Sequence, residues 1–377
     1  MKKIAVMIWR IFEKVIEYIF FIFPVAPKKI IFNNFNGSGF GCNPKYIAQE
    51  LHEQCPEWDM VWIIKNKKQY IPNYMRGVKE NSLKLLYELA TSHIIVTNVK
   101  CDIKIVKKKN QYVIQTWHAS FSPKYMEQDA CDKLGKRYLK ESKLNSEQTD
   151  LFLSNSSEQS KEYRKAFWCE CEIMECGYPR NDILFSCSNE LKIDIKRRLK
   201  IHKLTKIVLY TPTFREDDSI DAYQLDCEKV IDCLERQGDM WKLLIRMHPN
   251  VRRYKNIFQF GEKIIDVTDY PDIQELLVAA DMLITDFSTT MVDFSIMKKP
   301  VFLFAIDIEQ YIKQRGLKPV FFDFPFSLSR SNEELIENIE KFNNIEYLAK
   351  IEKFIHTYAS GDKGIAAKSV VERIMSL

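Results

Sequence analysis

The sequence predicts an α/β protein with two Rossmann-like, doubly wound domains that face a common cleft. Three observations favour this class. Apolar runs of strand length alternate with helix-like stretches through the first half of the chain, the alternation restarts at Lys206, and 377 residues exceed one ordinary core. Repeated alternation of this kind gives parallel sheets, which bind ligands beyond the carboxyl ends of their strands.

The first element, residues 1–27, is expected to be an amphipathic helix. Its charged residues occupy an arc of about 120° at helical spacing; they are Lys2, Lys3, Arg10, Glu13, Lys14 and Glu17. The longest uncharged stretch, 18–27, has about half the length of a membrane span, and Pro24 and Pro27 end it. We expect a monotopic helix in the surface of an anionic membrane; a helix packed on the protein and a secretory signal are the alternatives.

The N-terminal Rossmann-like domain is expected over residues 28–185. Short apolar runs rich in β-branched residues predict strands at 29–32, 60–64, 94–97, 112–116, 151–154 and 173–176. Stretches with helical periodicity between them predict helices at 44–53, 82–91 and 158–167. The domain boundary is expected near residues 183–190.

The C-terminal domain is expected over residues 186–360. The same signals predict strands at 206–210, 241–246, 264–267, 282–285 and 301–304. Helices are expected near 227–236, 272–279 and 289–297. A last helix within 361–377 is expected to pack back across the first domain.

Composition excludes several classes of protein. A content of 46% hydrophobic and 28% charged residues is typical of a folded globular chain. The net charge of +5 is small against 56 basic and 51 acidic residues, which argues against a nucleic-acid binder and is compatible with an anionic membrane surface. Cys169, Cys171 and Cys176 form the only cysteine cluster, and no second group at zinc spacing follows them. We therefore expect reduced thiols and no metal site.

Two strand-like runs end in a histidine, at His118 and at His248. Each predicted domain thus has an imidazole at the carboxyl end of a strand, where ligands of α/β sheets bind. The four other histidines lie in polar or helical contexts. An alternative is that His118 is a core histidine that only orders its loop.

A third strand end, at residues 280–294, carries a turn rich in hydroxyl groups. A buried run reaches Thr285 and Asp286 and is followed by Ser288, Thr289 and Thr290 at the start of a helix. Hydroxyls and amides at a helix start suit a phosphate. The alternative is an ordinary helix cap without a ligand.

Two further turns have residues suited to the same ligand. Thr213 and Arg215 follow the first strand of the C-terminal domain. Arg180 lies in a tight turn at the end of the N-terminal domain, where it can serve either as a phosphate fork or as an interdomain salt bridge. No Asp-x-Asp motif occurs, which disfavours a nucleotide held through a divalent ion, although 216–218 is acidic.

Several motifs, in this order along residues 30–325, resemble the CDP-glycerol glycerophosphotransferases of teichoic acid synthesis. They are Gln115-Thr116-Trp117-His118, Ser154-Asn155-Ser156, Gly177-Tyr178-Pro179-Arg180-Asn181-Asp182, Tyr210-Thr211-Pro212-Thr213-Phe214-Arg215, Arg246-Met247-His248-Pro249, Thr285-Asp286-Phe287-Ser288, and Asp307 to Tyr311 with Arg315-Gly316. The resemblance implies a GT-B fold, with acceptor binding by the N-terminal domain and CDP-polyol binding by the C-terminal domain. One departure is Ala119, where the family usually has glycine.

The resemblance also implies roles for individual residues. His118 and His248 are the expected catalytic pair. The expected donor-binding residues are Arg180, Thr213, Arg215, Arg246, Thr285, Asp286, Ser288, Thr289, Thr290, Asp307 and Arg315. The expected acceptor-binding residues are Gln115, Trp117, Asn43 and Lys124.

The predicted reaction is transfer of a polyol phosphate, most readily glycerol phosphate, from a CDP-polyol to a hydroxyl of a lipid-linked glycan or teichoic acid, with release of CMP. His118 acts as general base, and His248, Arg246 and the Ser288 turn stabilise the leaving phosphate without a cofactor or metal. The expected location is the cytoplasmic face of the cell membrane. Alternatives are a CDP-ribitol-dependent transferase for teichoic acid or capsule, a nucleotide-sugar glycosyltransferase, and an inactive binding protein.

Overall fold

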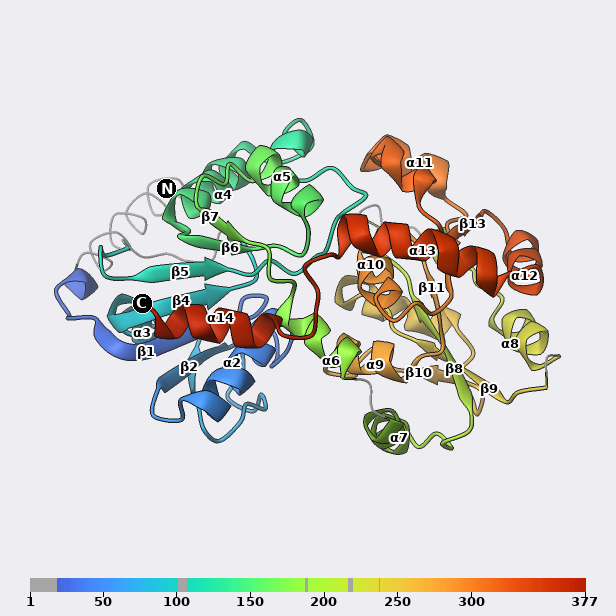
Figure 1. Ribbon diagram of the computed structural model, residues 1–377, viewed down its shortest axis with the longest axis horizontal. Coiled ribbons are helices and arrows are strands. Elements are labelled where there is room, and N and C mark those ends of the chain that lie inside the picture. Colours follow the sequence, from blue (N-terminus) through green and yellow to red (C-terminus); the bar gives the residue numbers. More distant parts are fainter. Residues whose placement is uncertain (1–18, 101–106, 187–188, 216–219, 237) are drawn as a thin grey trace, which may run out of the picture.

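The computed structural model describes residues 19–100, 107–186, 189–215, 220–236 and 238–377. These residues form two lobes, each with its own parallel sheet, as Figure 1 shows. The expected α/β class with two doubly wound sheets is confirmed. Most of the predicted amphipathic segment 1–27 lies outside the described residues, so the membrane helix is not described here.

The sheet of the N-terminal lobe has the strand order β3-β2-β1-β4-β5-β6-β7. Its strands are β1 Ala26–Asn33, β2 Asp59–Ile64, β3 Arg76–Lys79, β4 Ser92–Thr97, β5 Tyr112–Gln115, β6 Leu151–Leu153 and β7 Glu172–Met174. β1 pairs in parallel with both β2 and β4, so Ile31 lies between Val61 and Ile95. The winding direction reverses between β1 and β4, which makes this edge of the sheet a topological switch point.

The sheet of the C-terminal lobe has the order β10-β9-β8-β11-β12-β13. Its strands are β8 Lys206–Thr211, β9 Trp241–Ile245, β10 Ile264–Asp266, β11 Met282–Thr285, β12 Val301–Phe304 and β13 Ser327–Ser329. Leu209 pairs with Leu244 on one side and Leu283 on the other, again all parallel. The winding direction reverses between β8 and β11, at a second switch point.

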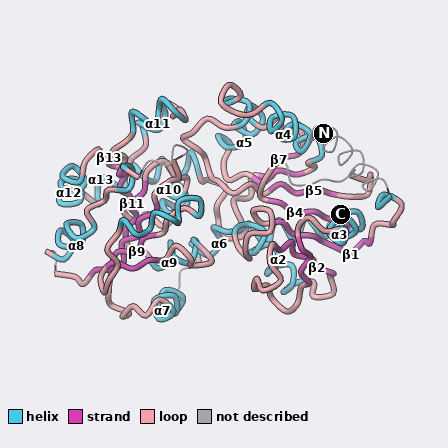
Figure 2. Tube along the Cα trace, turned by 180° about the vertical axis from the view of Figure 1, so that it is seen from behind, coloured by secondary structure: helices cyan, strands magenta, loops and turns pink. Residues whose placement is uncertain are grey.

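Helices cover both faces of each sheet, as Figure 2 shows from behind. In chain order they are α2 Cys42–Gln54, α3 Leu83–Thr91, α4 Lys136–Gln148, α5 Ser157–Ala166, α6 Asp182–Phe185, α7 Asn189–Arg198, α8 Cys227–Glu235, α9 Ile273–Ala279, α10 Thr290–Ser295, α11 Ile308–Gln314, α12 Asn332–Glu340, α13 Asn344–Tyr358 and α14 Ala366–Met375. Side-chain alternation in β1 explains the layers. Ile30 and Phe32 pack in one core with Ile47 of α2, while Ile31 packs in another with Leu89 of α3.

The chain ends by returning from the C-terminal lobe to the N-terminal lobe. Figure 1 shows α13 over the C-terminal sheet and α14 over the N-terminal one. Val370 and Val371 of α14 are buried in the same core as Ile30 and Ile47. Asp182 accepts hydrogen bonds from the first amides of α14, Ala366 at 3.0 Å and Ala367 at 2.7 Å, and so caps that helix.

Some elements were not predicted from the sequence. β3 and β13 are short, and β3 has a single fully buried residue, Val78, so neither shows a strand periodicity. α4 carries mostly polar residues and its hydrophobic stripe is weak. Across the part of the chain that the structure describes, no helix has both the length and the apolar character that crossing a membrane requires.

Candidate active site

The predicted site residues lie at the carboxyl ends of strands from both lobes. His118 follows β5, His248 follows β9, and the hydroxyl-rich turn follows β11. Contacts across the cleft bring the lobes together at these ends, among them the ion pair of Arg180 with Asp293 at 3.0 Å. The charge of His248 also contributes to the lowered pKa of His118, so the two imidazoles lie within electrostatic range.

The loop that holds His118 is fixed by buried side chains. Trp117 has a left-handed backbone with φ of 51°. Its amide donates to Oε1 of Gln115 at 3.0 Å, and Nδ2 of Asn43 donates to its carbonyl at 2.9 Å. The side chain of Gln115 also donates to the carbonyl of Val99 at 2.8 Å. Gln115 and Asn43 are fully buried and position the loop from inside, and their predicted contact with an acceptor stays a prediction.

His118 is held in one tautomer. Its Nδ1 lies 2.7 Å from the carbonyl oxygen of Asn98. A carbonyl only accepts, so Nδ1 carries the proton and Nε2 keeps a lone pair. Burial, the main cause, together with the charges of Arg180 and Lys124 lowers the pKa of His118 to about 4. The imidazole is therefore neutral near pH 7.

His248 has the opposite arrangement. Its Nδ1 accepts a hydrogen bond from the amide of Asn250 at 3.2 Å, and its ring stacks on Phe214 with centroids 5.8 Å apart. His248 is exposed at its strand end, and partial desolvation, the main cause, together with the charges of Lys124 and Arg246 lowers its pKa from the ordinary value. The neutral ring consequently carries its proton on Nε2 and presents a donor there.

Two predicted cations lie beside the histidines. Arg246 is half-buried, and its Nη2 donates to the carbonyl of Tyr270 at 3.2 Å. Lys124 is half-buried in a short antiparallel bridge to Leu317, and its charge acts on both histidines. These two cations make the electrostatic potential around the imidazole pair more positive.

The hydroxyl-rich turn after β11 is ordered by its own side chains. Ser288 Oγ lies 2.8 Å from Thr290 Oγ1 and accepts from the Thr290 amide at 3.3 Å. Thr289 is the residue before helix α10, and its side chain makes no capping bond. Thr285 is buried and donates to the carbonyl of Thr211 at 2.7 Å. The three hydroxyl residues of the turn are half-buried, whereas Thr285 supports the strand end.

Arg215 is the centre of a buried ionic network. Its guanidinium pairs with Asp286 at 2.9 Å and with Asp307 at 2.5 Å, and lies over the rings of Phe287 and Tyr311. Only 2% of its side chain is exposed.

The carboxylate of Asp286 also receives the amide and hydroxyl of Thr213. The network thus ties the loops after β8, β11 and β12 together. Arg315 ends α11 beside it. The buried charges of Arg215, Asp286 and Asp307 satisfy one another.

The turn 177–182 is a joint between the lobes. Gly177 has φ of 85°, and a Cβ there would lie 2.7 Å from the carbonyl of Gly361. The next amide, of Tyr178, donates to Asp362 at 2.8 Å.

Arg180 in this turn is buried, with Nε 3.1 Å from Asp293 and Nη2 3.3 Å from Ser120 Oγ. Arg180 thus makes the interdomain salt bridge, one of the two roles that the sequence left open, and its role as a phosphate fork stays a prediction.

Sequence reasoning missed three residues that organise the site: Asn98, Ser120 and Asp293. Asn98 directly follows β4, and this position at the carboxyl end of a strand could have indicated a site residue. Ser120 and Asp293 gain their roles only through contacts with distant segments, since Ser120 Oγ donates to the Asp293 carboxylate.

Over the described ranges, no three histidine, cysteine or acidic side chains come together in a way that could hold a metal ion. The Sγ atoms of Cys169 and Cys171 are 3.1 Å apart and lie in the core around Phe167.

Comparison with known sequences adds to this geometry. The model of the CDP-Glycerol:Poly(glycerophosphate) glycerophosphotransferase family matches residues 16–376. The teichoic acid poly(glycerol phosphate) polymerase of Bacillus spizizenii is 31% identical over 374 residues, which cover 94% of this chain and 93% of that protein. The polymerase of the same name from Staphylococcus epidermidis is 29% identical, over 93% of this chain and 51% of that protein. The chain therefore spans about half the length of some curated relatives.

Two solved structures and one further relative are also similar. The structure of the wall teichoic acid polymerase TagF superposes with a TM-score of 0.86 at 28% identity, covering 100% of this chain and 96% of that chain. A TagF variant soaked with CDPG superposes with a TM-score of 0.84 at 28% identity, over 93% of this chain and 89% of that chain. A teichoic acid poly(ribitol-phosphate) polymerase of Bacillus spizizenii is 27% identical, over 95% of this chain and 58% of that protein.

Proposed function

The chain belongs to the CDP-glycerol:poly(glycerophosphate) glycerophosphotransferase family, and from this premise we propose its reaction. It transfers glycerol phosphate from CDP-glycerol to a hydroxyl of a lipid-linked glycan or teichoic acid and releases CMP. Glycerol is the first choice of polyol because relatives named for poly(glycerol phosphate) match at 31% and 29% identity. Ribitol is the second, because a poly(ribitol-phosphate) polymerase is 27% identical.

The observation that carries the proposal is the pair of neutral histidines with opposite tautomers on opposite lobes. In His118 the ring proton is on Nδ1, which donates to the carbonyl of Asn98, and Nε2 has a lone pair. This histidine therefore suits a general base. Nε2 of His248 carries a proton, so this histidine suits a donor to a phosphate oxygen. One base and one donor are what in-line attack on a phosphorus requires.

The proposed mechanism follows from these roles. The acceptor hydroxyl loses its proton to His118 as it attacks the phosphorus that bears the glycerol, and the bond from that phosphorus to the CMP oxygen breaks. Charge grows on the CMP phosphate, where His248, Arg246 and the hydroxyls of Ser288 and Thr289 stabilise it. Such a reaction needs mainly positioning and electrostatic stabilisation.

The test is a panel of donors. Purified full-length protein receives CDP-glycerol, CDP-ribitol or a nucleotide sugar together with a lipid-linked acceptor, and nucleotide release is measured. CMP release with CDP-glycerol supports the proposal, and a preference for CDP-ribitol selects the second polyol. Release only from a nucleotide sugar would refute it in favour of a glycosyltransferase.

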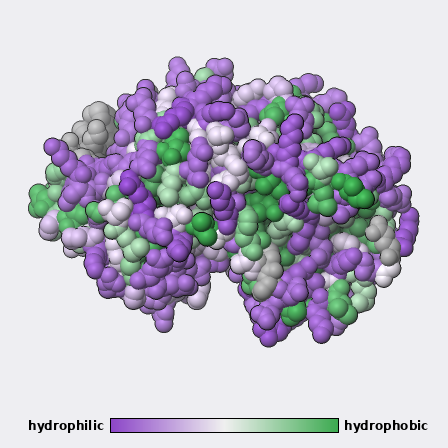
Figure 3. All heavy atoms as spheres, in the orientation of Figure 1, coloured by the Kyte–Doolittle hydropathy of each residue, from purple (hydrophilic) through white to green (hydrophobic). Residues whose placement is uncertain are grey.

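The proposal includes attachment to the cytoplasmic face of an anionic membrane. Exposed apolar side chains at the outer end of the N-terminal lobe support it: Ile19 is 52% and Ile22 77% exposed, next to exposed Phe21. Figure 3 shows hydrophobic side chains at that outer edge. Such residues can enter the headgroup layer while the cleft stays accessible to a lipid-linked acceptor.

Flotation with anionic vesicles tests the attachment. Replacing Ile19, Phe21 and Ile22 with serine is expected to reduce vesicle binding severalfold, because buried apolar area drives insertion. The matched control is Ile345→Ser in the other lobe, where the side chain is 81% exposed. Equal flotation of both variants would show that these side chains do not contact the membrane.

A further inference from the structure

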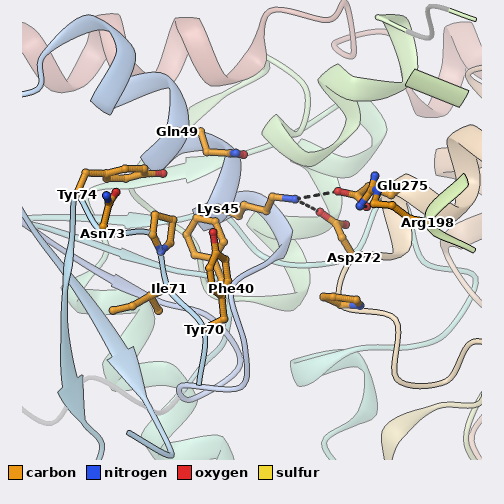
Figure 4. A pocket seen from close by; sticks show the side chains of 12 residues that line it. Phe40, Lys45, Gln49, Tyr70, Ile71, Asn73, Tyr74, Arg198, Asp272 and Glu275 are labelled. Atoms are coloured by element: carbon orange, nitrogen blue, oxygen red, sulfur yellow. Dashed lines mark hydrogen bonds and ion pairs between the residues drawn. The ribbon is translucent and has the colours of Figure 1, made fainter. Parts of the chain in front are cut away.

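A hollow lies between the lobes, to one side of the histidine pair. Its volume is about 750 Å³, and residues of both lobes line it. Figure 3 shows the surface notched between the lobes, and Figure 4 shows the side chains that line this hollow. It adjoins the catalytic cleft through Tyr270, whose carbonyl receives Arg246 and whose hydroxyl donates to Glu275 at 2.6 Å in the wall.

The wall formed by the N-terminal lobe is aromatic and carries amides. Tyr70 is 77% exposed, although an aromatic ring is ordinarily covered. Tyr74 stacks on His52 at 3.9 Å, so its ring plane is fixed, and Phe40 packs on Trp62 at 4.7 Å. The exposed side chains of Gln49 and Asn73 lie beside these rings. Rings beside amide groups suit a ligand that has apolar faces and many hydroxyls.

The opposite wall carries charges that cancel. Lys45 reaches across from α2 to Asp272 at 2.5 Å and Glu275 at 3.7 Å, as the dashed lines in Figure 4 mark. Arg198 pairs with Glu275 at 2.7 Å. Two cations thus face two carboxylates, so this wall has no excess positive charge that would attract a polyanion. The carboxylate oxygens remain able to accept hydrogen bonds from hydroxyls.

We propose that this hollow binds a neutral sugar ring, namely the glycan part of the acceptor. The assignment of the glycan to the acceptor rests on the proposed function. The rings of Tyr70 and Tyr74 cover the apolar face of the sugar, and Gln49, Asn73 and the carboxylates bind its hydroxyl or acetamido groups. The balanced charge of this hollow makes it unsuitable for the donor diphosphate, which needs unpaired cations.

Titration calorimetry on the full chain tests the site with defined probes. These are N,N′-diacetylchitobiose and cellobiose as neutral disaccharides, and CMP and glycerol 3-phosphate as anions. We expect Tyr70→Ala and Gln49→Ala each to weaken disaccharide binding about fivefold, the size of one lost stacking or hydrogen-bonding contact. Binding of CMP is expected to be unchanged, and Tyr70→Phe to keep disaccharide affinity.

Phe322→Ala is the matched control, because this ring is 52% exposed and lies outside the hollow. The proposal is overturned if neither disaccharide binds the wild-type chain, if Tyr70→Ala and Gln49→Ala bind them as well as Phe322→Ala does, or if these two variants lose CMP instead. Calorimetry needs no turnover, so a chain that binds disaccharide but releases no CMP would count against the proposed reaction and leave the sugar site standing.

Discussion

Removing the carboxylate of Asp293 is expected to destabilise the protein strongly, because it leaves the guanidinium of Arg180 buried without a counter-charge. Only 3% of Arg180 is exposed, and Asp293 supplies acceptors for its Nε at 3.1 Å and Nη2 at 3.2 Å. Asp293 also accepts from Nδ2 of Asn181 at 3.2 Å. Breaking a buried pair by removing one partner costs about 3–5 kcal/mol.

The expected cost for Asp293→Ala corresponds to a fall in melting temperature of roughly 6–20 °C for a lobe of this size. Differential scanning calorimetry measures it. Glu141→Ala is the control, because its pair with Arg137 has side chains 74% and 44% exposed. Such a surface pair contributes about 0–1 kcal/mol, so the control is expected to melt within a few degrees of wild type.

A double variant separates a structural role of Arg180 from a donor-binding role. Replacing the pair with apolar residues, Arg180→Met with Asp293→Leu, removes both buried charges and is expected to recover most of the lost stability. If Arg180 only joins the lobes, the KM for CDP-glycerol stays within about threefold of wild type. A double variant that melts normally but has lost donor affinity tenfold or more would refute the reasoning and show that Arg180 binds the donor phosphate.

Four further predictions concern catalysis. His118→Ala and His248→Ala are each expected to lower kcat by about two orders of magnitude or more without changing the melting temperature, and folded variants with near-normal CMP release would contradict the assignment. Because the pKa of His118 is lowered to about 4, its neutral, basic form persists above that pH, and kcat/KM is expected to fall only on acidification toward that value. Lys124→Gln removes a positive charge that lowers the pKa of both histidines, so the acid limb of the pH profile is expected to move up by a few tenths of a unit; a downward shift would contradict this. Ser288→Ala with Thr289→Ala is expected to raise the KM for CDP-glycerol about tenfold and to leave acceptor KM unchanged, and a chelator is expected to have little effect on either variant or wild type.

The local pattern of the sequence was enough to predict the two sheets and the histidines at their strand ends. Apolar runs such as that before His118 are strands because their β-branched side chains pack on both faces of a parallel sheet. The carboxyl ends of parallel strands share one edge, so the sequence alone predicts both histidines at the cleft. The order of motifs then identified the family.

Only the tertiary structure decided how individual side chains are used. Arg180 pairs with Asp293, 113 positions away in the chain, and this partner makes it a joint between the lobes. The tautomers of His118 and His248 depend on a backbone carbonyl and a backbone amide, and the positions of these groups cannot be inferred from the sequence pattern. The hollow with Tyr70 and Glu275 in its walls exists only because two lobes meet there. Local periodicity follows from burial of each element on its own sheet, whereas these pairings depend on how separate loops approach one another in space.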